Sequence, residues 1–176
     1  MSAHAVTPSQ TVGPFFHDCL LRVDRCESTG GDEGGVQIDL EGRVIDGDGA
    51  AVPDAVIEMW QSASFARIGT GADGEFSFST TRPKPVELDR GTMQAPHLSI
   101  AVFARGLMNH LFTRIYFEDE PSTERDPILH LVPEARRATL IAKRAPDQGL
   151  TPRYRFDIVL QGPGETVFFD FRSTGR

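Results

Sequence analysis

The stretch HLSIAVFARGLMNHLFTRIYFED, residues 97–119, contains two runs of β-branched, aliphatic and aromatic residues on either side of a glycine-containing segment. Runs of this composition and length are typical of β-strands. In the second run, Phe112, Arg114 and Tyr116 share one face, because alternate side chains of a strand point to the same side. The stretch therefore predicts two strands, the second of which carries an arginine between two aromatic side chains.

Similar short runs recur along the chain and are separated by turns rich in Gly, Pro and Asp. They cover residues 36–46, 55–61, 70–80, 153–162 and 165–171. One segment departs from this pattern: PEARRATLIAKRA, residues 133–145, has Pro and Glu at its start and basic residues near its end, as a helix does. The pattern predicts an all-β fold, an antiparallel β-sandwich of about seven or eight strands, with one short helix near 133–144.

The chain of 176 residues is long enough for one domain with a sizeable core. Residues 1–35 read as an extended N-terminal arm and linker, and residues 36–176 as the β-sandwich domain. The segment TPSQTVGPFF in the arm, residues 7–16, is too apolar for a free tail. Two alternatives stay open for it: packing on its own domain, or clamping another chain.

The formal net charge is −7, and the acidic residues are dispersed along the chain. This balance argues against nucleic acid or an anionic membrane as a partner. No apolar run approaches the roughly 20 residues that a membrane-spanning helix needs, and the first residues lack a leader pattern. We therefore expect a cytoplasmic protein.

Metal-binding and catalytic motifs are scarce. His97 opens a strand, but Ser99 stands where a second histidine would complete a chelating pair on the same face. Because a redox metal needs three or four convergent ligands, a structural role for His97 is the simpler interpretation. Arg114 has two interpretations: an aliphatic stem packed on aromatic rings, or a guanidinium held in place for an anion such as a carboxylate.

Several segments together resemble the alpha subunits of the protocatechuate 3,4-dioxygenase family, which are intradiol ring-cleavage dioxygenases. They are TPSQTVGPFFH, GRVIDGDGAAVPDAVIEMWQ, APHLSIAVFARGL, LFTRIYFEDE, TLIAKR and YRFDIVLQGPGETVFFDF. The resemblance runs from Thr7 to Phe171 and is weakest between Cys19 and Gly35 and in the loop after Trp60.

The resemblance implies a hetero-oligomer in which the beta subunit holds Fe(3+) through two tyrosines and two histidines. His97 matches the first of those histidines, Ser99 replaces the second, and the segments matching the tyrosine positions contain no tyrosine. No metal ligand and no catalytic residue is therefore expected in this chain. It would instead wall the partner's active site and bind substrate through the residues that the resemblance carries over: Thr11, Gly13, Pro14, Phe15 and Arg114.

The implied reaction is the intradiol cleavage of protocatechuate (3,4-dihydroxybenzoate) by O2 to 3-carboxy-cis,cis-muconate, in the β-ketoadipate route of aromatic degradation. Two alternatives stay open. One is a metal-free β-sandwich that acts as a binding or scaffold module without a catalytic role. The other is an intradiol enzyme for a different catechol such as hydroxyquinol, which would need tyrosine ligands that the expected segments lack.

Overall fold

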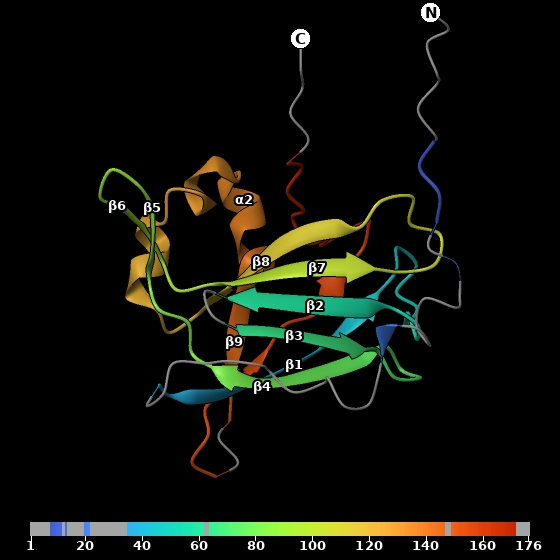
Figure 1. Ribbon diagram of the computed structural model, residues 1–176, viewed down its shortest axis with the longest axis horizontal. Coiled ribbons are helices and arrows are strands. Elements are labelled where there is room, and N and C mark those ends of the chain that lie inside the picture. The colour runs from blue at the N-terminus through green and yellow to red at the C-terminus, as the bar shows by residue number, and fades with distance from the viewer. Residues whose placement is uncertain are drawn as a thin grey trace, which may run out of the picture.

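The computed structural model describes residues 8–11, 13, 20–21, 35–61, 64–146 and 149–171 (Figure 1). These residues form eleven strands: β1 (Gln37–Ile45), β2 (Val56–Gln61), β3 (Ser64–Gly69), β4 (Glu75–Thr81), β5 (Val86–Asp89), β6 (Thr92–Gln94), β7 (Leu98–Phe103), β8 (Leu111–Phe117), β9 (Ile141–Ala145), β10 (Arg153–Arg155) and β11 (Ile158–Val159). Both strands expected within residues 97–119 are present as β7 and β8. No helix of the described residues is long and apolar enough to cross a membrane.

The strands form two layers that face each other across a common core. One layer has the order β3-β2-β7-β8 with antiparallel pairing throughout, and the other is built around β1, which pairs with β4, β10 and β11 (Figure 1). β9 pairs with both β8 and β10 and so connects the layers at one edge. The predicted all-β sandwich is confirmed.

The pairing is less uniformly antiparallel than expected. β8 and β9 run parallel, as do β1 and β10, and β1 and β11. Parallel neighbours need a long crossover connection, and residues 118–140 supply it for β8 and β9. This connection holds three 3-10 helices, η2 (Pro121–Arg125), η3 (Leu129–Leu131) and η4 (Ala138–Leu140), and the short α-helix α2 (Glu134–Arg137).

The predicted helix is present but shorter than residues 133–144. α2 ends at Arg137, and the segment from Ile141 onward is strand β9. Ile141 and Ala142 lie opposite Tyr116 and Phe117 in the sheet, so their backbone groups bond to β8 rather than continuing a helix. Tertiary pairing therefore overrides the helical pattern in the second half of the segment.

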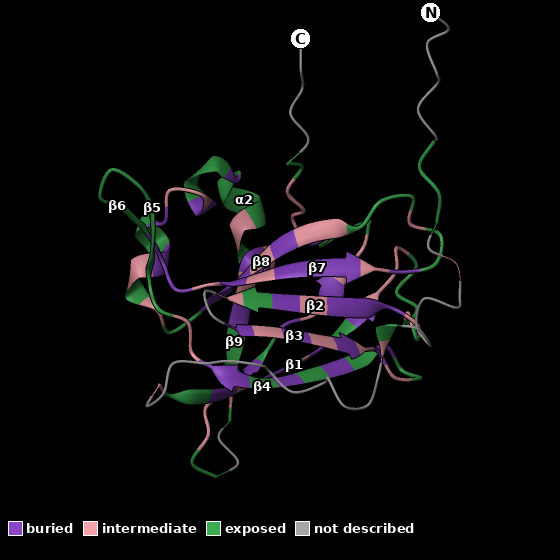
Figure 2. Ribbon diagram, in the orientation of Figure 1, coloured by how far each residue is buried: buried purple, intermediate pink, exposed green. Residues whose placement is uncertain are grey.

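Strand β8 lies between two apolar clusters. Its residues Ile115 and Phe117 belong to the core between the layers, whose members include Ile38, Leu40, Ile57, Met59, Ile100 and Ile158. Tyr116, on the opposite face, belongs to a second cluster with Ala95, Leu129, Val132 and Leu140. The crossover segment thus packs against Tyr116 on the outer face of β8, at the end of the strand that Figure 2 colours as buried.

Residues 8–11 and 13 of the N-terminal arm have no regular secondary structure, and Ser9 and Thr11 contact the loop between β7 and β8. The Ser9 hydroxyl donates to Asn109 Oδ1 at 3.3 Å, and the Gly106 N–H donates to Thr11 Oγ1 at 3.0 Å. This favours packing on the chain's own domain for residues 8–11. The division at residues 35 and 36 stays a prediction, since residues 22–34 lie outside the described residues.

We predict that Gly42→Ala destabilises the fold. A Cβ at this buried position of β1 would collide with the backbone oxygen of Phe156 and lie 2.9 Å from Phe76 Cζ. Overpacking of this kind costs about 1–3 kcal/mol of the free energy of unfolding, to be measured by urea denaturation. Ser77→Ala, at an exposed position of the neighbouring strand β4, is the control and should stay within about 0.5 kcal/mol of the wild type. Equal stability of Gly42→Ala and the control would contradict the prediction.

Candidate functional site

Arg114 lies in the middle of β8, on the face that points away from the main core. It stands opposite Ser99 of β7, and Ser99 in turn stands opposite Trp60 of β2. Trp60 is half exposed, while Arg114 is half-buried. Three neighbouring strands therefore present an aromatic ring, a hydroxyl and a guanidinium in one row across the outer face of the sheet.

The Arg114 guanidinium is held on one side and open on the other. Its Nη1 donates to Gln94 Oε1 at 2.7 Å and lies 3.4 Å from Tyr116 Oη, and its Cζ is 6.0 Å from the ring centre of Phe169. Within the described residues, Nε and Nη2 have no hydrogen-bond partner and the side chain has no ion pair. The guanidinium itself lies over an aromatic ring and still offers two donor groups, and both interpretations of Arg114 stay predictions.

Most other arginines of the described chain are neutralised locally. Arg67 pairs with Glu58, Arg82 with Asp119 and Arg153 with Glu41. A half-buried cation without a carboxylate partner is costly, since burial weakens its hydration. The free donors of Arg114 therefore mark a place where an external anion would be stabilised.

Asp126 is the buried group that organises this region. Its carboxylate is 1% exposed and accepts four hydrogen bonds, from the Tyr116 hydroxyl at 2.9 Å and from the N–H groups of Ala95, Ile128 and Leu129 at 2.8 to 2.9 Å. The bonds to Ile128 and Leu129 form a local Asp-centred turn. Asp126 thereby ties the crossover segment to β8 and to the segment that leads into β7.

His97 is a bonded, largely buried residue. Its Nδ1 lies 2.8 Å from the carbonyl oxygen of Ala95, and its ring centre is 5.7 Å from that of Tyr116. Burial lowers the pKa of His97 below its usual value, because the protein interior disfavours the charged imidazolium. These contacts support the structural interpretation of His97.

The arm residues that the resemblance carries over do not contact Arg114 where they are described. Thr11 docks on the loop between β7 and β8, and Gly13 has a positive φ of 72° with open space around it. Pro14 and Phe15 lie outside the described residues. Within this chain, Thr11 therefore lies at the loop that leads into β8, and Arg114 lies farther along the same strand.

An aromatic groove of about 530 Å³ lies on the same side of the molecule as the loop after β7 and the C-terminal segment. It is lined by residues 107–112 and 168–171, so it includes part of the loop that binds Thr11 and also Phe169, which packs on Arg114. Phe112 contacts His110 at 4.5 Å and Phe171 at 5.4 Å between ring centres. The groove gives the region an apolar wall beside its single guanidinium.

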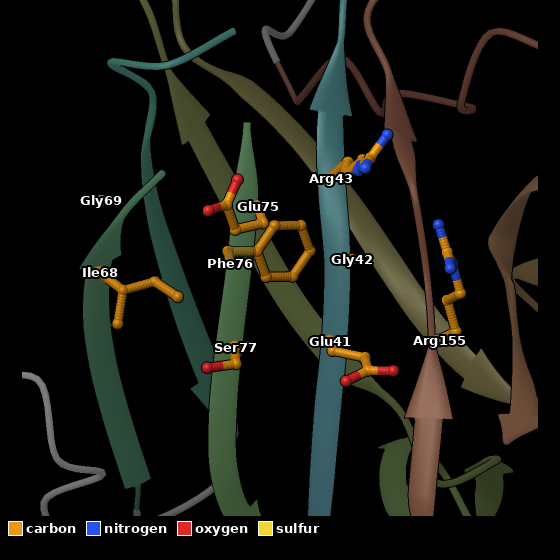
Figure 3. A pocket seen from close by; sticks show the side chains of 9 residues that line it. All are labelled: Glu41, Gly42, Arg43, Ile68, Gly69, Glu75, Phe76, Ser77 and Arg155. Carbon is orange, nitrogen blue, oxygen red and sulfur yellow. The ribbon is translucent and has the colours of Figure 1, made fainter. Parts of the chain in front are cut away.

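A second groove, of about 510 Å³, lies where β3 meets β1 and β4 (Figure 3). Figure 3 shows Arg43 and Arg155 on one side of β1 and Glu75 and Ser77 on the other. None of its lining residues was predicted as a site residue, and its charges are of both signs. This groove offers no comparable set of convergent donors.

Comparison with known proteins identifies the family. Residues 12–162 match the Dioxygenase family profile. The protocatechuate 3,4-dioxygenase alpha chain of Burkholderia cepacia is 40% identical over 196 residues, which cover 93% of this chain and 96% of that protein. The chain belongs to the intradiol dioxygenase family.

The intradiol family contains both alpha and beta chains. The protocatechuate 3,4-dioxygenase beta chain of Burkholderia cepacia is 28% identical over 184 residues, covering 90% of this chain and 77% of that protein. The dioxygenase domain of a dioxygenase carbohydrate-binding protein fusion from Streptomyces sp. SirexAA-E has the same fold, with a TM-score of 0.61, 24% identity, and coverage of 89% of this chain and 99% of that one. The family resemblance inferred from the sequence is confirmed.

Intradiol dioxygenases depend on iron, and we asked whether the side chains here fit a ferric ion. They do not. The Tyr116 hydroxyl donates to Asp126, and the Tyr154 hydroxyl donates to Asp119 at 2.8 Å. Burial raises the pKa of Tyr116 and of Tyr154, which disfavours the tyrosinate that a ferric ion would require. Among the described residues, no three His, Cys, Asp or Glu side chains converge as a metal-binding group.

Sequence reasoning missed Gln94 and Asp126. Asp126 precedes a proline, which is a turn signal, and this signal was available in the sequence. No sequence signal pointed to Gln94, because it lies 20 positions from Arg114 and only the fold brings the two side chains together. Their contribution follows from the structure alone.

We predict that His97 makes the stability of the protein depend on pH. Because its pKa is lower in the folded state, the unfolded chain binds the proton more readily, and protonation favours unfolding. The free energy of unfolding therefore includes the full contribution of neutral His97 above about pH 6.5. It decreases as the pH falls below that value. Urea denaturation at about pH 7.5 and 5.5 gives the free energy of unfolding at each pH. Its decrease from about pH 7.5 to 5.5 should be larger for the wild type than for His97→Leu, whose side chain does not titrate. Equal losses in the two proteins would show that another group is responsible.

Proposed function

We propose that this chain is the alpha subunit of a protocatechuate 3,4-dioxygenase and works only together with a beta subunit. The observation that carries this proposal is the 40% identity to an alpha chain along nearly the full length of both proteins. The mismatch between its tyrosine and histidine environments and a ferric site is consistent with a subunit that holds no iron itself. In this proposal the Fe(3+) belongs to the partner beta subunit, where it activates the catechol ring for reaction with O2.

The reaction proposed for the assembled enzyme is the intradiol cleavage of 3,4-dihydroxybenzoate to 3-carboxy-cis,cis-muconate in the β-ketoadipate pathway. The contribution of this chain is to bind and orient the substrate and to exclude water. Arg114 pairs with the substrate carboxylate through Nε and Nη2, the two groups that find no acceptor among the described residues. A planar guanidinium and a carboxylate match each other in geometry and charge.

The wall of the cavity is proposed to come from the N-terminal arm, through Thr11, Gly13, Pro14 and Phe15. Thr11 is fixed by its bond to Gly106, and the positive φ of Gly13 allows a sharp change of chain direction there. We also propose that residues 1–35 form an arm and linker apart from the sandwich domain of residues 36–176, and that the enzyme is cytoplasmic.

The first test of this proposal is Arg114→Met in the alpha chain, co-expressed with a beta chain. We predict a rise of about 10- to 100-fold in KM for 3,4-dihydroxybenzoate, because a charge-assisted pair with the carboxylate is lost. Oxygen uptake measures the reaction, and Arg43→Met, which removes an exposed arginine of β1, is the matched control. Unchanged kinetics in Arg114→Met would favour the metal-free scaffold interpretation.

The second test concerns iron. We predict that the chain purified alone contains no stoichiometric iron and lacks the visible colour that tyrosinate-to-iron(III) charge transfer gives, whereas the complex with a beta chain has both. Elemental analysis and absorption spectra check this directly. An iron-loaded, coloured and active protein made of this chain alone would overturn the division of roles between the subunits.

A further inference from the structure

Gln94 is a buried polar side chain aimed at Arg114. It is the last residue of β6, is 6% exposed, and its Oε1 accepts the shortest hydrogen bond that the Arg114 guanidinium makes. The same Nη1 atom also donates to the Tyr116 hydroxyl, at the longer distance of 3.4 Å. Gln94 is therefore the principal contact that fixes where the guanidinium points.

Gln94 is itself anchored. The N–H of the next residue, Ala95, donates to Asp126 Oδ2 at 2.8 Å, and the carbonyl oxygen of Ala95 bonds to His97. The other oxygen of Asp126 accepts from Tyr116. One buried carboxylate thus holds both groups that touch Arg114 Nη1, so the guanidinium rests on a rigid support rather than on a mobile loop.

The chemical identity of this support matters. An amide oxygen orients a guanidinium without neutralising it, whereas Glu58 and Glu41 neutralise Arg67 and Arg153 elsewhere in the chain. Gln94 therefore leaves the positive charge of Arg114 available while removing part of its rotational freedom. Such pre-organisation lowers the entropic cost of binding an anion.

We propose that Gln94 is a positioning residue that aims Arg114 at the substrate carboxylate and keeps its charge unneutralised. The proposal rests on the proposed function, because it takes the aromatic carboxylate as the ligand of Arg114. Gln94 touches no substrate in this scheme and acts only through Arg114, with Asp126 and Tyr116 behind it.

The experiment uses the assembled alpha–beta enzyme and two inhibitors of 3,4-dihydroxybenzoate turnover, 4-hydroxybenzoate with a carboxylate and phenol without one. Gln94→Met keeps the size and shape of the side chain but removes the acceptor. Gln94→Glu keeps the acceptor and adds a negative charge. Thr92→Val, at an exposed position of the same strand, is the control.

We expect Gln94→Met to raise the inhibition constant of 4-hydroxybenzoate about 3- to 10-fold, and Gln94→Glu about 10-fold or more, because the added carboxylate neutralises Arg114. The inhibition constant of phenol should stay within about 2-fold in both variants, a selectivity that a merely structural role would not produce. Thr92→Val should match the wild type with both inhibitors.

The outcomes separate this inference from the proposed function. If Arg114→Met leaves the 4-hydroxybenzoate constant unchanged, the proposed role of Arg114 itself is wrong. If Arg114→Met weakens that inhibitor and both Gln94 variants behave like the wild type, the positioning role is wrong and the proposed function stands. Should Gln94→Met fail to assemble with the beta chain, Gln94→Glu decides alone. Failure of both to assemble would assign Gln94 to folding and overturn the inference.

Discussion

Strand β8 is packed against the main core on its inner face and against the second cluster at Tyr116 on its outer face, and this constraint positions Arg114. Ile115 and Phe117 are fixed in the core between the layers, and Tyr116 is fixed in the second cluster under the crossover segment. A one-residue shift of register would turn Arg114 toward the main core and Ile115 and Phe117 away from it, so the packing fixes the register. The half-buried position of Arg114 follows from this packing.

The electrostatics of the region follow from the same arrangement. Asp126 is the one buried carboxylate among the described residues. Its four hydrogen bonds come from backbone N–H groups and from Tyr116, and it forms no ion pair with Arg114. Gln94, an uncharged acceptor, takes that place. The fold thus keeps the positive charge of Arg114 partly desolvated and without an ion pair among the described residues, a state that folding energetics disfavour unless an external anion compensates for it.

The sequence predicts the parts of this structure that depend on local patterns. Alternation in residues 111–117 correctly separates Arg114 and Tyr116 from Ile115 and Phe117, and the turn residues correctly bound β1 and β2. The expected strand at residues 165–171 is wrong: this segment forms only the isolated bridge between Phe169 and Phe112, and the expected strand at 153–162 is divided into β10 and β11. The pattern fails where pairing over long distances decides the outcome. Residues 141–145 have a helical composition but pair with β8 and β10, and Gln94 reaches Arg114 only because β6 and β8 meet in space.

The two tyrosines bonded to carboxylates and the Arg114 guanidinium together favour a subunit over an inert scaffold. In a scaffold, the tyrosines buried and hydrogen-bonded at Asp126 and Asp119 would contribute to stability, as they do here. A half-buried guanidinium without an ion pair would only reduce that stability. A glutamate in place of the neutral Gln94 would neutralise the charge and remove this destabilisation. In this chain the two tyrosine hydroxyls are hydrogen-bonded to carboxylates, and Arg114 is oriented by Gln94 without an ion pair among the described residues. That combination favours a role for Arg114 in holding an external anion over a purely structural one.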